Sequence, residues 1–154
     1  MAKADVVVVR QKINKNYISS VGRRREAVAR VRLYTGKTEI GGVAVTKGDI
    51  LVNNKPAVEY FRFKAQMPVV NKFLLDLGIS DKYVFTSRVT GGGIESQLDA
   101  LILGMARALD KMDKDTFHDA LRQKGHLTRD PRTRERRKVG NAGKARRKKS
   151  SPKR

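Results

Sequence analysis

The sequence predicts an α+β fold, a two-layer sandwich in which helices cover one face of a mixed sheet and a long basic C-terminal arm follows. Three observations lead to this prediction. Residues 27–33 alternate between an apolar face and a face that carries Arg30 and Arg32, as in a half-buried strand. Residues 95–111 carry an apolar stripe with helical spacing. The final 33 residues are too basic and too poor in apolar side chains to build a core.

The first half of the chain is predicted to begin as an antiparallel sheet. Residues 1–19 precede it as a flexible N-terminal extension. The strand of residues 27–33 comes next, and glycines interrupt the chain after it. Residues 49–52 form a short strand that ends in the turn residues 53–56.

The second half supplies the helices that cover the sheet. Apolar residues at helical spacing follow Pro68, and Gly78 stands where a helix C-terminal cap belongs. Residues 83–89 return to a strand pattern, residues 95–111 form the long helix, and residues 116–123 form a final short helix.

The long helix gives the strongest local signal. Its apolar stripe consists of Leu98, Leu101, Ile102, Met105, Ala106, Leu109 and Met112. Gly104 lies inside this helix, where glycine costs about 1 kcal/mol relative to alanine. We therefore expect Gly104 to mark a close contact with a neighbouring element.

The positive charge is concentrated at the C-terminal end. The 154 residues have a net charge of +20. Residues 1–121 hold 20 Lys and Arg against 13 Asp and Glu, a net of +7, whereas residues 122–154 hold 15 against 2, a net of +13. We expect a globular body over residues 20–125 and an extended basic arm over residues 126–154 that orders on a polyanion such as a nucleic acid.

Several classes of protein are excluded by what the chain lacks. It has no cysteine and only two histidines, His118 and His126, so no metal or cofactor is expected. Residues 36–38 resemble the end of a phosphate-binding P-loop, but Val31 stands where its first glycine should be. No catalytic constellation is legible, and no apolar run approaches the roughly 20 residues of a membrane span. We expect a soluble protein that is not secreted through a signal peptide, is not an enzyme and has no membrane partner.

A basic cluster near the start of the body is a candidate nucleic-acid site. Arg23, Arg24 and Arg25 directly precede the strand that carries Arg30 and Arg32. We expect these five guanidinium groups to lie on one side of the body, where each can form paired hydrogen bonds to a phosphate. The competing interpretation is a merely solvated face, but Glu26 is the only acid between Gly22 and Tyr34.

Two further candidate sites follow along the chain. Gly91, Gly92 and Gly93 open the long helix, and this triplet is either an anion-binding turn or a tight turn that needs positive φ. The arm supplies the other basic candidates: Arg129, Arg132, Arg134, Arg136, Arg137, Lys138, Lys144, Arg146, Arg147, Lys148 and Lys149. Basic tracts of this kind also serve as nuclear-localisation signals.

Five separated motifs resemble one known family. They are the run from Gly22 to Val31, Lys55-Pro56 with Glu59-Tyr60-Phe61, the glycine triplet, Ala106-Arg107-Ala108-Leu109, and the run from Leu127 to Lys138 with the closing Lys153-Arg154. In this order and spacing, the chain from about residue 20 to 154 is similar to the bacterial-type small-subunit ribosomal protein nine family.

The resemblance implies more than the residue patterns show. It implies a left-handed βαβ crossover, as in domain two of ribosomal protein five, although such crossovers are right-handed in nearly all proteins. It implies binding to the three-prime major domain of ribosomal RNA in the head of the small subunit, beside neighbouring head proteins. It also implies that Lys153 and Arg154 contact peptidyl-site transfer RNA. The alternative is a free, histone-like architectural protein that binds nucleic acid.

The boundary between body and arm is testable in the free protein. Limited proteolysis should cut repeatedly beyond Gly125 and leave a resistant core, because Leu127 and Val139 are the only sizeable apolar side chains of the arm and cannot build a core. Recovery of a protected segment of residues 126–154 without RNA would contradict this prediction.

Overall fold

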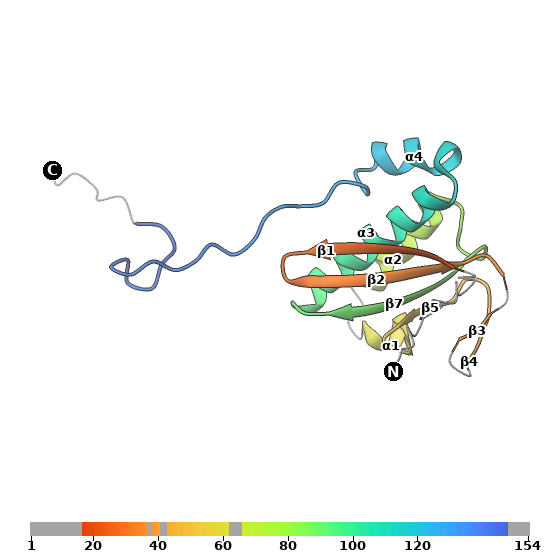
Figure 1. Cartoon of the computed structure of the whole chain (residues 1–154), viewed down its shortest axis with the longest axis horizontal. Helices are drawn as coiled ribbons and strands as arrows, with labels where there is room; N and C mark the ends of the chain where they lie inside the picture. The colour runs from red at the N-terminus through yellow and green to blue at the C-terminus, as the bar shows by residue number, and fades with distance from the viewer. Residues whose placement is uncertain (1–16, 37, 41–42, 62–65, 148–154) are drawn as a thin grey trace, which may run out of the picture.

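The computed structural model describes residues 17–36, 38–40, 43–61 and 66–147 (Figure 1). Its elements follow in chain order: β1 (Ile18–Arg24), β2 (Ala27–Tyr34), β3 (Thr38–Ile40), β4 (Val43–Val45), β5 (Ile50–Val52), β6 (Lys55–Pro56), α1 (Ala57–Tyr60), α2 (Met67–Asp76), β7 (Val84–Thr90), α3 (Ile94–Met112) and α4 (Lys114–Gln123).

Five strands form a mixed sheet in the order β1-β2-β7-β5-β6, and β3 pairs with β4 in a separate hairpin. The pairs β1–β2, β2–β7 and β5–β6 are antiparallel, whereas β5 and β7 are parallel. The chain passes through α1 and α2 between these two parallel strands. The predicted α+β fold with a mixed sheet and helices is therefore confirmed.

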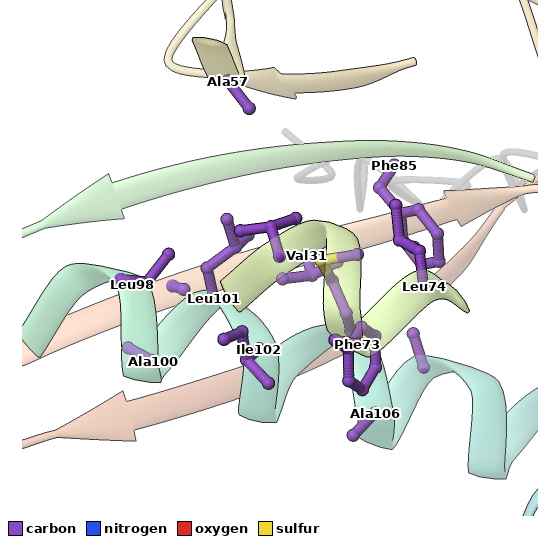
Figure 2. Packing of buried hydrophobic residues seen from close by; sticks show 14 of the residues in the cluster. Val31, Ala57, Phe73, Leu74, Phe85, Leu98, Ala100, Leu101, Ile102 and Ala106 are labelled. Atoms are coloured by element: carbon purple, nitrogen blue, oxygen red, sulfur yellow. The ribbon is translucent and has the colours of Figure 1, made fainter. Parts of the chain in front are cut away.

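The predicted alternation of β2 decides which face of the sheet is covered. Ala27, Ala29, Val31 and Leu33 are each at most 1% exposed. These side chains form one cluster with the buried residues of α2 and α3, and Figure 2 shows Leu101 and Phe73 within that cluster. The strand is buried on this face because every second residue is apolar.

The first strand of the sheet was not predicted. β1 begins at Ile18, inside the segment expected to be an extension, and its first described neighbour is Tyr17. Only Ser20 and Gly22 of this strand are buried, so its hydrophobic pattern is weak. β1 is a strand because it pairs with β2 and contacts α3.

The close contact expected at Gly104 is present, and a second glycine makes it possible. A Cβ on Gly22 would lie 1.9 Å from Ala100 O and 2.5 Å from Gly104 N. A Cβ on Gly104 would lie 2.5 Å from Val31 Cγ2. The two glycines therefore let the backbones of β1 and α3 approach each other directly. Buried Ser20 adds a hydrogen bond, since its Oγ donates to Gly104 O at 2.6 Å.

The body ends shortly after α4. Asp113 caps this helix: its carboxylate accepts from Thr116 Oγ1 at 2.6 Å and from Thr116 N at 3.3 Å, and these two hydrogen bonds lower the pKa of Asp113. Phe117 and Leu121 are buried beneath the helix. His126 then packs edge-on against Phe73 with ring centroids 5.0 Å apart, and its burial lowers the pKa of the imidazole.

The contact between β1 and α3 yields a stability prediction. Gly22→Ala should lower the free energy of unfolding by about 2–3 kcal/mol, because the new methyl group meets backbone atoms that have no room to move. Urea unfolding followed by circular dichroism measures this change.

Gly36→Ala is the matched control. Among the described residues, a Cβ on Gly36 would meet nothing within 4 Å. The control should change the free energy of unfolding by less than about 0.5 kcal/mol. Equal effects of the two substitutions would contradict the close contact.

Candidate nucleic-acid interface

Four arginine side chains lie on the face of the sheet that α3 leaves uncovered. In β2, Arg30 and Arg32 are exposed and alternate with residues that are buried against the helix. β1 adds Arg23, which pairs with Val28, and β7 adds Arg88, which pairs with Arg30. Side chains of paired residues point to the same face, so the four guanidinium groups share one surface, called the open face below. In β1, β2 and β7, no strand residue on this face is acidic.

A groove of about 630 Å³ runs along the open face. It is lined by Arg30, Arg32, Leu51, Asn53, Asn54, Thr86, Ser87, Arg88, Val89 and Thr90. Asn53 holds the turn after β5 in place, because its amide donates to Val89 O at 3.0 Å and accepts from Val89 N at 2.9 Å. The groove thus combines guanidinium groups with amide and hydroxyl groups, a set that suits the phosphate and sugar oxygens of a nucleic acid.

One guanidinium of the open face, that of Arg32, lies over an aromatic ring. The Arg32 guanidinium carbon lies 4.8 Å from the centroid of the Tyr17 ring. That ring in turn lies 5.6 Å from Tyr34. A guanidinium above an aromatic ring keeps its in-plane N–H groups available for hydrogen bonds. Arg32 is therefore oriented and can still donate to a ligand.

The prediction that all five arginines face one side is wrong for Arg24. Arg24 pairs with Ala27, which is fully buried, so it points to the helix side of the sheet. There it forms ion pairs with Asp99 at 3.2 Å and Asp130 at 2.9 Å. Alternation within β1 separates it from Arg23, and Arg25 occupies the turn between β1 and β2 with φ +50°.

The glycine triplet is explained by its turn. Gly91 and Gly92 have φ values of +74° and +63°, and a Cβ on Gly91 would lie 2.5 Å from Glu26 O. Gly93 is the N-terminal cap of α3 and has an ordinary extended conformation. The tight-turn interpretation therefore accounts for Gly91 and Gly92, and a phosphate contact at the triplet stays a prediction.

The described part of the arm has no helix or strand from residue 128 to residue 147, and Figure 1 shows it extending far from the sheet. Its basic side chains are all exposed: Arg129, Arg132, Arg134, Arg136, Arg137, Lys138, Lys144, Arg146 and Arg147. Lys148, Lys149, Lys153 and Arg154 lie outside the described residues.

Both acidic residues of the arm are paired with arginines of the arm. Asp130 contacts Arg132 at 2.6 Å, and this hydrogen bond, together with the Arg132 backbone N–H, holds the pKa of the carboxyl far below its usual range. Glu135 contacts Arg146 at 2.9 Å, which likewise lowers its pKa. The second pair closes a loop in which Lys138 N donates to Lys144 O at 3.2 Å. The acids therefore shape the backbone of the arm and stay ionised.

Both histidines contact residues of the body. His118 Nδ1 lies 2.7 Å from Asp110 Oδ1, and His126 packs on Phe73. Within the described ranges, no group of three or more histidine, aspartate or glutamate residues could hold a metal ion.

None of the helices in the described part of the chain is both long enough and apolar enough to span a membrane.

Arg88 is the arginine of the open face that the sequence analysis missed. The strand containing it was predicted, and its alternation places Arg88 opposite the buried Phe85 and Val89. The missing information was the pairing of β7 with β2, which brings Arg88 beside Arg30 from 58 positions away in the chain. A pairing of this kind cannot be obtained from periodicity alone.

Comparison with known proteins adds independent evidence. The model of a family described as ribosomal protein S9/S16 matches residues 22–154. The chain belongs to this family. The match begins at Gly22, inside β1, and covers the rest of the body and the whole arm.

Individual relatives agree with the family match. The chain is 41% identical over 120 residues to "Small ribosomal subunit protein uS9" of Trichormus variabilis, covering 77% of this chain and 79% of the relative. It is 42% identical over 120 residues to the protein of the same name from Prochlorococcus marinus, covering 77% and 80%. It is 38% identical over 126 residues to "Small ribosomal subunit protein uS9c" of Mesostigma viride, covering 81% and 83%.

Membership of the ribosomal protein S9/S16 family has two consequences. The family is structural and non-enzymatic, which confirms the prediction that the chain is not an enzyme. It also confirms the resemblance found in the five sequence motifs, and with it a role in translation.

Proposed function

We propose that this chain is a structural constituent of the small ribosomal subunit in the cytoplasm. In this proposal the body, which includes all of β1 and ends near residue 125, binds the three-prime major domain of ribosomal RNA in the subunit head, beside neighbouring head proteins. The arm, residues 126–154, extends along ribosomal RNA, and its end contacts peptidyl-site transfer RNA. The crossover between β5 and β7 is left-handed in this proposal. Family membership and the names of the relatives support the ribosomal assignment over a free, histone-like protein.

The open face is the observation that carries the RNA-binding proposal. It combines four exposed arginines on three adjacent strands with a groove that contains three of them. Solvated protein surfaces normally mix positive and negative charges, whereas the strand residues of this face include no acid. Folded RNA offers a comparably one-sided surface of phosphates, and A-form helices are recognised mostly through phosphates and 2′-hydroxyls. The face is therefore complementary to the backbone of RNA.

The arm suits a partner that lies away from the body. At full extension, residues 128–154 could span at most about 90 Å. Their charge prevents collapse in the absence of a polyanion, and the exposed cations can neutralise phosphates along the path. In a fully extended arm, Lys153 and Arg154 would be the residues farthest from the body. This supports a separate role for them at transfer RNA.

The contribution of the open face can be measured with a double substitution. Arg30→Gln with Arg88→Gln should weaken binding to a ribosomal RNA fragment and reduce the slope of log affinity against log salt by about 1.4–1.8, because each phosphate contact contributes roughly 0.7–0.9. Filter binding or fluorescence titration over a range of salt concentrations gives this slope.

The matched control removes two exposed charges from α4, with Lys114→Gln and Arg122→Gln. It should leave the slope almost unchanged, since these residues lie away from the open face. Equal losses of slope in the two variants would mean that the face acts only through net charge.

The end of the arm can be tested separately from the rest. Deletion of Lys153 and Arg154 should leave subunit assembly intact but weaken binding of peptidyl-site transfer RNA and reduce its salt dependence, because two cations are lost from that contact. Transfer-RNA binding to purified subunits measures this effect. The control, Lys148→Gln with Lys149→Gln, removes the same charge and should spare transfer-RNA binding. Unaltered transfer-RNA affinity after the deletion would rule out the contact.

A further inference from the structure

Arg24 is placed differently from the other arginines near the start of the body. Its side chain is only 11% exposed, although it lies at the end of an edge strand. Within the described part of the chain, neither Arg23 nor Arg25 has an ion-pair partner, whereas Arg24 has two. Its surroundings therefore require an explanation other than RNA binding.

The contacts of Arg24 join three separate parts of the chain. Its Nε donates to Asp99 Oδ2 of α3 at 3.2 Å. Its Nη2 lies 2.9 Å from Asp130 Oδ2, and its Nη1 donates to the backbone oxygen of Arg132 at 3.4 Å. One guanidinium thus links β1, α3 and the root of the arm. The planar fork of arginine is suited to several acceptors at once, which a lysine ammonium cannot bridge with the same geometry.

The two acids around Arg24 differ in what they do. Asp99 belongs to the body and anchors the guanidinium against α3. Asp130 belongs to the arm, and Arg132 N donates to its carboxylate at 2.9 Å in a local turn. Pro131 stiffens the chain between Asp130 and Arg132 because its ring restricts φ. The arm is therefore gripped at a segment that is itself well defined.

We propose that Arg24 is a positioning residue that clamps the root of the arm to the body and so sets the direction in which the arm leaves it. The proposal rests on the proposed function, in which the arm reaches RNA. Arg24 itself contributes no phosphate contact in this scheme, because its donors already serve two carboxylates and a carbonyl oxygen. Preorganising the arm reduces the entropy lost when it settles on RNA.

Distance measurements on the free, full-length protein test the clamp directly. The chain has no cysteine, so spin labels can be attached at Leu75→Cys on α2 and Thr133→Cys on the arm, both of them exposed positions. Double electron–electron resonance should show a narrow distance distribution. Arg24→Gln should broaden it, since residues 128–133 released as a flexible chain spread over roughly 12 Å.

Two further variants make the result decisive. Asp130→Asn removes the partner on the arm without touching the helices or the sheet, and it should broaden the distribution as Arg24→Gln does, even if the latter variant folds poorly. Arg23→Gln removes the neighbouring arginine and the same charge, and it should leave the distribution narrow. Any one of three results would overturn the clamp. The distance distribution could be broad in the unsubstituted protein, it could stay narrow in Asp130→Asn, or Arg23→Gln could broaden it as much as Arg24→Gln does.

RNA titrations separate this inference from the proposed function. Arg24→Gln should weaken binding to the ribosomal RNA fragment about fivefold through lost preorganisation, with an unchanged salt slope. Arg23→Gln should reduce the slope by about 0.7–0.9. An unchanged RNA affinity after truncation at Leu127 would contradict the proposed function of the arm. The distance measurements would still show whether Arg24 holds the arm against the body. A reduced slope in Arg24→Gln would make Arg24 a phosphate ligand and overturn its positioning role.

Discussion

The direct approach of β1 to α3 at Gly22 and Gly104 is the constraint on which the body depends. β1 is the edge strand of the sheet and buries few side chains, so it gains little from hydrophobic packing. The approach allows long side chains of α3 to bind its free edge, with Arg107 donating to Val21 O at 2.9 Å and Lys111 donating to Ser19 O at 3.1 Å. These contacts satisfy backbone oxygens that an edge strand would otherwise leave to solvent.

The helix layer on one face of the sheet determines what the other face can do. Since α3 packs along β1 and β2, the apolar half of each alternating strand faces inward. On the other half, Tyr34 and Val84 are buried with Val45 at one end. The rest of that half is partly or fully exposed, and it carries Arg23, Arg30, Arg32 and Arg88. The same alternation that builds the core therefore collects charge on the opposite surface. Binding and folding use separate faces of one sheet, so substitutions on the open face need not disturb the core.

The arm follows a different physical rule from the body. Its described residues bury almost nothing after Leu127, and their conformation depends on ion pairs and backbone hydrogen bonds rather than on packing. Exposed ion pairs usually contribute little to stability. The contact of Asp130 with Arg24 differs because the guanidinium is largely buried and also bound to Asp99. The junction of body and arm is thus the best-anchored part of the arm.

The sequence by itself determined the α+β class, the strand of residues 27–33, the three longer helices within a few residues, and the close packing at Gly104, because these follow from local periodicity and from the properties of glycine. It also identified the family through motifs that the comparisons confirmed. Tertiary structure alone decided that β1 is a strand, that Arg88 joins Arg30, and that Arg24 turns away from Arg23. Each of these depends on pairing or contact between residues more than 50 positions apart, or on which face of an edge strand a helix covers, and local sequence does not encode such choices.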